Sequence, residues 1–165
     1  MDGQDTLFER IVLLKGVPFF ELLRTDQLRY LAAALEPIAW PGKEIIFERG
    51  EAGDAMYIIV SGKVGISLKE NPPFDDFIAE LEAGEFFGDM AILDDQPRSA
   101  SAITIEGTEA YSLSKEKTRG LLLAYPELGT GMLRALSRRL RSSSQLLDKY
   151  RAELAKSLEK NQPPS

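Results

Sequence analysis

The chain has 165 residues, of which 44% are hydrophobic and 28% charged, and its formal net charge is −6. This composition suits a single globular domain over residues 1–165, and no apolar stretch approaches the roughly 18 residues of a membrane span. The chain has neither cysteine nor histidine, which excludes disulfides, cysteine nucleophiles, the Ser-His-Asp triad and histidine metal sites. We therefore expect a binding module with no metal and no catalytic residues.

The first 37 residues predict two short helices. Apolar residues recur at helical spacing over Thr6–Leu14 and Thr25–Leu35, and Thr25 is the predicted N-cap of the second helix. The apolar run Ile11–Leu14 lies between Arg10 and Lys15, which is unlike a secretory leader. We therefore expect a cytoplasmic location and no membrane partner.

Residues 38–114 predict strands, because glycine and proline recur at short intervals between apolar or alternating runs. The predicted strands are Glu44–Phe47, Met56–Val60, Val64–Leu68, Phe77–Leu81, Ala100–Ile105 and Ala110–Leu113. Together they predict an antiparallel β sandwich or barrel.

Helical periodicity returns over residues 115–160, as Lys115–Ala124 and as a long helix that starts after Pro126, and residues 161–165 read as a tail. On the long helix, eight residues recur at alternating intervals of three and four positions: Leu133, Leu136, Leu140, Ser143, Leu147, Tyr150, Leu154 and Ser157. This is the spacing of a heptad seam, although one helix face packed on its own domain has the same pattern.

Charge is divided unequally along the chain. Residues 131–165 carry eight cations and three anions, whereas the preceding 130 residues carry 12 cations and 23 anions. A basic helix can mark a nucleic-acid surface or be the solvated face beside an acidic body. The second interpretation is favoured, because the acidic body would repel a phosphate backbone, so we expect no DNA partner.

Residues 84–102 are the strongest candidate for a binding site. Gly88 permits a positive φ angle, Asp89–Leu93 can form one helical turn with free amides, and Arg98 and Ser99 follow Pro97. Amides, a guanidinium and a hydroxyl together suit a phosphate group. An ordinary surface turn, with Arg98 paired to a nearby aspartate, would also explain these residues.

This segment resembles the phosphate-binding cassette of the cyclic nucleotide-binding domain family, Phe-Gly-Glu-x-Ala-Leu followed by Pro-Arg-x-Ala. The matching residues are Phe87, Gly88, Ala91, Pro97, Arg98 and Ala100, and residues 41–64 resemble the family's strand-turn-strand signature. The resemblance is greatest to the bacterial catabolite activator and fumarate-nitrate regulator group, without its helix-turn-helix domain. It implies an α+β fold: an antiparallel β-roll or jelly roll flanked by short N-terminal helices and a long C-terminal helix.

The resemblance also implies roles for individual residues toward cyclic AMP or cyclic GMP as the ligand. Arg98, Ser99 and the amide of Ala91 would bind the phosphate, and Gly88 and Asp89 would face the ribose. The family has glutamate where this chain has Asp89, which shortens the side chain by roughly 1.5 Å, about one single bond. Loss of that charged hydrogen bond would weaken binding by about 1.5 to 3 kcal/mol.

Further implied contacts concern the base and a second copy of the chain. Val64 and Ile66 would be apolar contacts, and Ser143 and Ser144 would reach the base, since Arg138, Arg139 and Leu140 repeat the Arg-Arg-Leu of the family's dimer helix. We therefore expect a homodimer that senses a cyclic nucleotide and signals to an unidentified protein partner. The alternative is a ligand-free dimerisation or adaptor module that has kept the fold.

Overall fold

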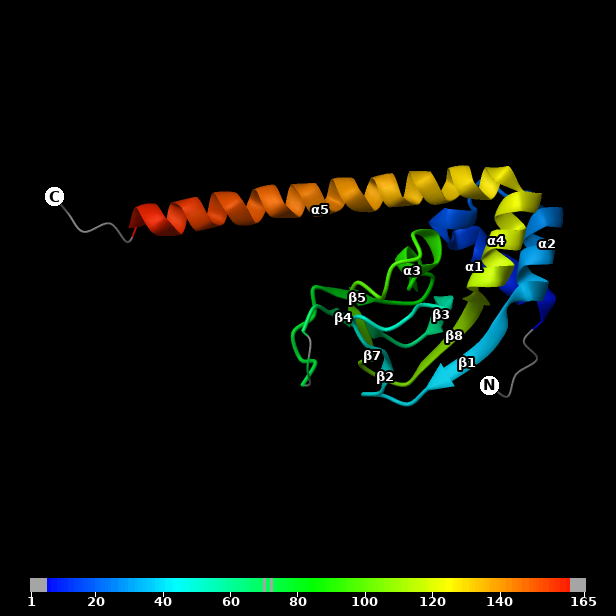
Figure 1. Cartoon of the computed structure of the whole chain (residues 1–165), viewed down its shortest axis with the longest axis horizontal. Helices are drawn as coiled ribbons and strands as arrows, with labels where there is room; N and C mark the ends of the chain where they lie inside the picture. The colour runs from blue at the N-terminus through cyan, green and yellow to red at the C-terminus, as the bar shows by residue number, and fades with distance from the viewer. Residues whose placement is uncertain (1–5, 70, 72, 161–165) are drawn as a thin grey trace.

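Two short helices and a 3-10 turn precede the sheets in the computed structural model, which describes residues 6–69, 71 and 73–160 (Figure 1). Helix α1 spans Leu7–Gly16, η1 spans Pro18–Phe20 and α2 spans Thr25–Ala34. Thr6 begins α1 with a capping box, because its hydroxyl accepts from the Glu9 amide at 3.3 Å and the Glu9 carboxylate accepts from the Thr6 amide at 2.9 Å. Thr25 was wrongly predicted as an N-cap: it is the first helical residue of α2, and Arg24 is the cap.

In the described part of the chain, eight strands form two four-stranded antiparallel sheets, which confirms the predicted α+β roll. One sheet has the order β1-β8-β3-β6 and the other has the order β2-β7-β4-β5. The strands are β1 Glu36–Trp40, β2 Ile45–Phe47, β3 Ala55–Ser61, β4 Val64–Ser67, β5 Ala79–Leu81, β6 Phe86–Phe87, β7 Ser101–Thr104 and β8 Thr108–Ser114. The single turn of α3, Met90–Leu93, lies between β6 and β7.

Strand β1 was missed in the sequence, where the helical segment was expected to run to residue 37. Pro37 has no amide to donate and argues against a strand, yet it lies opposite Tyr111 in register. The position is tolerated because β1 is an edge strand that pairs only with β8. The two residues of β6 were also missed, since so short a strand has no readable alternation.

The core has two parts that meet at β3. Ile58 belongs to the cluster under the helices, with Phe19, Leu28 and Leu128, whereas Ile59 belongs to the smaller cluster between the sheets. Successive side chains of a strand point to opposite faces, so β3 contributes to both clusters. One strand thus fixes the helical layer against the roll.

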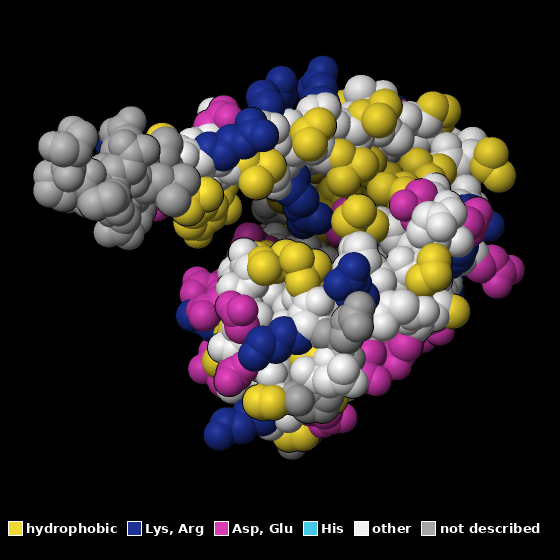
Figure 2. Space-filling view, turned by 60° about the vertical axis from the view of Figure 1, so that its left-hand side comes forward, with side chains coloured by type: hydrophobic (Ala, Val, Ile, Leu, Met, Phe, Trp, Pro, Cys, Tyr) yellow, Lys and Arg dark blue, Asp and Glu magenta, His cyan; other side chains and the backbone are white. Residues whose placement is uncertain are grey.

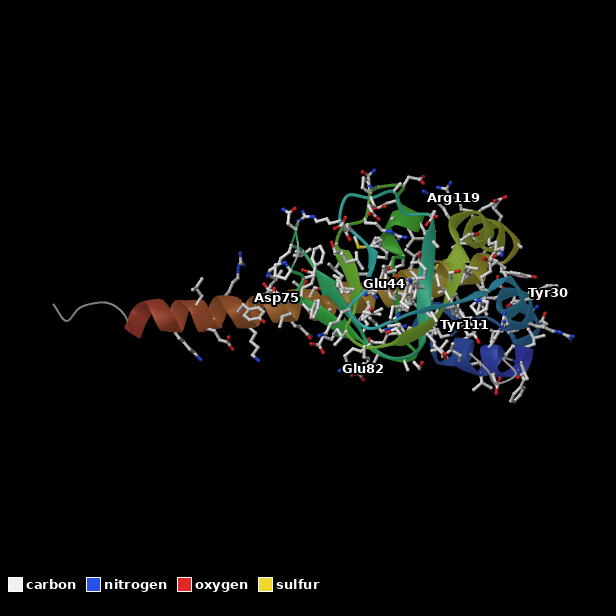
Figure 3. All side chains as sticks on the ribbon, turned by 90° about the horizontal axis from the view of Figure 1, so that it is seen from below. Tyr30, Glu44, Asp75, Glu82, Tyr111 and Arg119 are labelled. Carbon is white, nitrogen blue, oxygen red and sulfur yellow. The ribbon has the colours of Figure 1, made fainter. Side chains whose placement is uncertain are left out.

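Helix α4, Lys115–Ala124, and helix α5, Pro126–Lys160, follow the roll. In Figure 1 the helices α1, α2 and α4 gather at one end of the roll, and α5 runs along its upper side and beyond its far edge. Among the described side chains of α5, those buried lie near its start: Leu128, Met132 and Ala135 face the core. Farther along, the side chains of α5 radiate into solvent (Figure 3). The backbone of α5 is described to Lys160, whereas the Ser157 side chain and the expected tail at 161–165 lie outside the described residues.

Gly131 sets how closely α5 approaches η1. A Cβ atom at this position would lie 2.3 Å from the Phe19 carbonyl oxygen, a separation that real Cβ atoms do not show. By contrast, a Cβ at Gly129 would meet only the end of Leu122, at 3.6 Å. The close contact of α5 with η1 therefore requires glycine, which has no side chain, at position 131.

Candidate functional site

The cassette predicted from the sequence lies between β6 and β7, beside α5. Gly88 links β6 to α3 with a φ of +78°, as the sequence predicted, and a Cβ there would lie 2.7 Å from Nη1 of Arg98. Gly53 approaches from the loop before β3, where a Cβ would lie 2.4 Å from Cβ of Ala91 and 3.1 Å from the Arg98 guanidinium. Two glycines thus leave room for one arginine.

Arg98 is a buried cation whose ion-pair partner, Asp54, is exposed and at the far limit of an ion-pair distance. It is 4% exposed, and it donates from Nη1 to the Gly88 carbonyl at 2.9 Å and from Nη2 to the Ala55 carbonyl at 2.8 Å. The exposed Asp54 carboxylate is 3.9 Å away, and burial lowers the pKa of Arg98 from its usual range.

The guanidinium of Arg98 also stands 4.0 Å from the centre of the Phe47 ring. Its Nε is buried and has no hydrogen-bond partner among the described residues. A buried donor of this kind costs free energy unless something accepts from it. The arrangement therefore suits an anion that would complete both the charge balance and the hydrogen bonding.

Asp89 is held by an arginine of α5 that the sequence did not single out as a site residue. Asp89 is 2% exposed, and its two carboxylate oxygens lie 3.1 and 3.3 Å from Nη1 of Arg139. Arg139 also donates to the Phe86 carbonyl at 3.3 Å and stands over the Phe86 ring. Residues four apart share a helix face. Because Ser143 was expected at the base, Arg139, four residues before it, could also have been expected to face the site.

A pocket of about 300 Å³ lies between the cassette, the second sheet and α5. It brings together most of the predicted site: Ile66, Gly88, Asp89, Ala91, Arg98, Ser99 and Ser143. Further apolar walls come from Ile78 and Leu81. The pocket thus has an Arg98 end, an Asp89–Arg139 end and an apolar side, which is the combination of fixed polar groups and apolar walls typical of small-molecule sites.

Two predicted site residues do not line this pocket. Val64 is fully buried in the cluster between the sheets, deeper than Ile66 on the same face of β4. Ser144 is exposed, and its hydroxyl donates to the Leu140 carbonyl at 3.0 Å. Because Ser144 neighbours Ser143 on the helix, it points away from the pocket of its own chain.

Charge is distributed as the sequence suggested. Figure 2 shows basic side chains along α5 and acidic side chains gathered on the roll below it. Among the described residues, no helix is long and apolar enough to cross a membrane, and no group of three or more acidic residues is placed to hold a metal ion.

Comparison with known proteins identifies the family of this fold. The profile of the cyclic nucleotide-binding domain matches residues 37–125, which include all eight strands apart from the first residue of β1. The chain belongs to the cyclic nucleotide-binding domain family. The match ends within one residue of the end of α4, so it contains the cassette and its neighbours in the roll but not α5.

Relatives of this domain include a CRP-like cAMP-activated global transcriptional regulator of Mycobacterium tuberculosis, 31% identical over 135 residues, or 82% of this chain and 60% of the relative. The crystal structure of the Thermus thermophilus catabolite activator protein aligns with a TM-score of 0.72 and 30% identity, covering 89% of this chain and 73% of that one. A cyclic nucleotide-binding domain from Methylobacillus flagellatus aligns with a TM-score of 0.64 and 26% identity, covering 96% and 85%. The chain thus spans about 60% of the length of the regulator it matches.

Proposed function

We propose that this domain is a non-catalytic sensor that binds cyclic AMP or cyclic GMP in the pocket beside α5. The observation that carries the proposal is Arg98, a buried guanidinium at the pocket whose Nε lacks a partner among the described residues. A cyclic phosphate is a compact monoanion that would accept from this donor and balance its charge. Family membership and the regulators among the relatives agree with this function.

The phosphate would lie at the Arg98 end of the pocket. Arg98 supplies the charge and the Nε donor, the exposed hydroxyl of Ser99 supplies a second donor, and the amide of Ala91 supplies a third. The carbonyls of Gly88 and Ala55 already hold the outer guanidinium nitrogens. The guanidinium is therefore oriented before the ligand arrives, which lowers the entropy lost on binding.

The ribose would face Gly88 and Asp89. A carboxylate has about four lone-pair sites, so Asp89 can accept from a ribose hydroxyl while it is still bound to Arg139. Arg139 balances the charge of the buried carboxylate and orients it, so Asp89 can accept from the ribose hydroxyl, although with a side chain one methylene shorter than the family's glutamate it reaches less far.

The base would lie toward α5. Ile66 offers an apolar wall backed by Val64, and Ser143 offers a hydroxyl at the helix. Ser144 points away from its own pocket, so it would act on the pocket of a second copy. We include it in the site on that basis.

The second copy would pair through α5. Leu133, Leu140, Leu147 and Leu154 recur every seven residues and are 62 to 69% exposed. Such a stripe is typical of a coiled-coil seam, and a parallel partner helix would bury it. Occupancy of the pocket would then be passed to a partner protein through the paired helices.

Calorimetric titration of the purified chain with cyclic AMP and cyclic GMP tests the binding. We expect saturable binding of at least one nucleotide, loss of it in Arg98→Ala, and full retention in Arg29→Ala, which removes an exposed arginine of α2 outside the pocket. Absence of binding by the parent chain would refute the sensor and leave the adaptor alternative.

Sedimentation velocity tests the dimer. Leu140→Glu combined with Leu147→Glu should give a monomer, because charges in the seam remain unpaired on association. Gln145→Glu, an exposed change on another face of the helix, is the matched control and should remain dimeric. A parent chain that is monomeric at micromolar concentration would contradict the dimer.

The cytoplasmic location stays a prediction.

A further inference from the structure

Met90 differs from the other described methionines in its exposure and its position. It is 49% exposed and lines the pocket as the first residue of α3, whereas Met56 and Met132 are 0% and 3% exposed in the core. An oxidant in solution reaches an exposed thioether far more readily than one sealed in a packed core. Among the described methionines, Met90 is therefore the accessible one, and it lies at the pocket.

The sulfur of Met90 contacts Ser99, one of the residues proposed to bind the phosphate. The hydroxyl of Ser99 donates to Met90 Sδ at 3.4 Å. A thioether is a weak acceptor, so this hydroxyl can leave it readily for a phosphate oxygen. The sulfur thus contacts one of the three groups assigned to the phosphate, and Met90 immediately precedes Ala91, the residue whose amide is the third.

We propose that Met90 is an oxidation site at which peroxide lowers the affinity of the pocket for its ligand. The sulfur lone pair attacks one oxygen of hydrogen peroxide, an S–O bond forms and the O–O bond breaks. The departing hydroxide takes the proton of the transferred hydroxyl and leaves as water. The thioether loses two electrons and becomes a sulfoxide, and the peroxide is reduced.

The sulfoxide changes the Arg98 end of the pocket in two ways. Its oxygen is a far stronger acceptor than the thioether sulfur, so it holds the Ser99 hydroxyl that the phosphate would otherwise receive. It also places a polar, larger group at the wall of the pocket. Loss of one hydrogen bond to a charged phosphate corresponds to about a tenfold or greater weakening of nucleotide binding. Enzymatic reduction of the sulfoxide reverses the change.

Mass spectrometry identifies the oxidised residue without reference to the ligand. Trypsin separates the four methionines into peptides 1–10, 50–63, 70–98 and 120–134. After brief treatment with hydrogen peroxide, the peptide with Met90 should gain one oxygen well before those with Met56 and Met132. Saturating cyclic nucleotide should slow that gain by covering the sulfur. Oxidation of Met90 no faster than that of Met56 or Met132 would overturn the proposal.

Calorimetry then compares each variant with itself, before and after peroxide. The parent should lose about tenfold in affinity and recover it after treatment with methionine sulfoxide reductase. Met90→Leu, a near-isosteric change, should give the same affinity before and after peroxide, whatever its own starting value. Ser99→Ala should show a smaller loss than the parent. An equal loss in Met90→Leu would overturn the proposal.

This inference rests on the proposed function, and the two fail differently. An untreated chain that binds neither nucleotide refutes the sensor and, with it, control of affinity by Met90. An untreated chain that binds and keeps its affinity after complete oxidation of Met90 refutes only the role of Met90.

Discussion

Replacement of Arg98 by alanine separates the binding role of this side chain from its structural role. The guanidinium donates two hydrogen bonds to carbonyls of Gly88 and Ala55, each worth about 1.5 to 3 kcal/mol because the donor is charged. Removing it also relieves the burial of a charge, which costs several kcal/mol and lowers the pKa of Arg98. These terms oppose one another, so we expect unfolding free energy to change by only about 1 to 2 kcal/mol.

Binding should change much more. A desolvated phosphate that loses its charged partner is an uncompensated charge, and such a loss costs about 3 to 5 kcal/mol, or two to nearly four orders of magnitude in affinity. Arg98→Lys keeps the positive charge but has no donor at the position of Nε. Its nucleotide affinity should therefore lie between those of Arg98→Ala and the parent.

The assay combines calorimetry with thermal unfolding of the same samples. A folded Arg98→Ala protein with an unfolding transition near that of the parent and no measurable nucleotide binding is the expected result. If it binds within about tenfold of the parent, the unpartnered Nε is not the phosphate donor and the reasoning fails.

Four further predictions concern residues of the site and of the packing around it. Asp89→Glu should tighten nucleotide binding by about tenfold or more by restoring the family's reach to the ribose; unchanged or weaker binding in calorimetry would show that the pocket is built around the shorter carboxylate. Arg139→Gln leaves the Asp89 carboxylate buried without its cation and should destabilise the fold by about 1 to 2 kcal/mol, discounted because Arg139 is partly exposed. Denaturant unfolding should show recovery when Asp89→Asn is added, and simple additivity of the two changes would argue against the pair. Gly131→Ala should destabilise by about 1 to 3 kcal/mol through its clash with the Phe19 carbonyl, whereas Gly129→Ala should be neutral or stabilising; equal unfolding midpoints for the two variants would refute the close approach. Hydrogen bonds from Lys115 and Arg119 lower the pKa of Asp95, so this carboxylate favours the folded state above its unfolded pKa and loses that effect as pH falls through its folded pKa. Asp95→Asn should therefore flatten the fall in unfolding temperature below about pH 4, and an unchanged slope would count against the pairing.

The proposed coupling between pocket and helix depends on a few polar contacts between α5 and the rest of the domain. Arg139 of α5 reaches the cassette at Asp89, and Arg138 beside it lies 3.3 Å from the Glu21 carboxylate after η1. One turn of the same helix therefore contacts both the pocket and the N-terminal helices. A ligand that shifts Asp89 would displace Arg139 and this turn of α5. The displacement would extend along the helix, because a helix moves as a rigid element.

Much of the local structure is determined by the sequence alone. The boundaries of α4 agree with the residues predicted, since its pattern is helical and Ser114 precedes it as an N-cap. The positive φ of Gly88 and the short helix that follows it were also predicted, because both are local requirements, whereas the assignment of this segment to a phosphate came from the resemblance. Alternation along β3 was readable for the same reason, since neighbouring residues must face opposite sides of a sheet.

Tertiary structure decided what depends on contacts between distant residues. Pro37 is acceptable in a strand only because β1 lies at the edge of its sheet, which is a property of strand order. Val64 and Ile66 are two residues apart on the same face of β4, yet only Ile66 lines the pocket, because Val64 is buried inside the cluster between the sheets and Ile66 is only partly buried against it. Arg139 is 50 residues from Asp89; the role implied for Ser143 pointed to this face of α5, but neither segment indicates by itself that Arg139 would pair with Asp89. Their pairing follows from how α5 passes the cassette, and the direction of α5 depends on the packing of its first turns against η1 and the core.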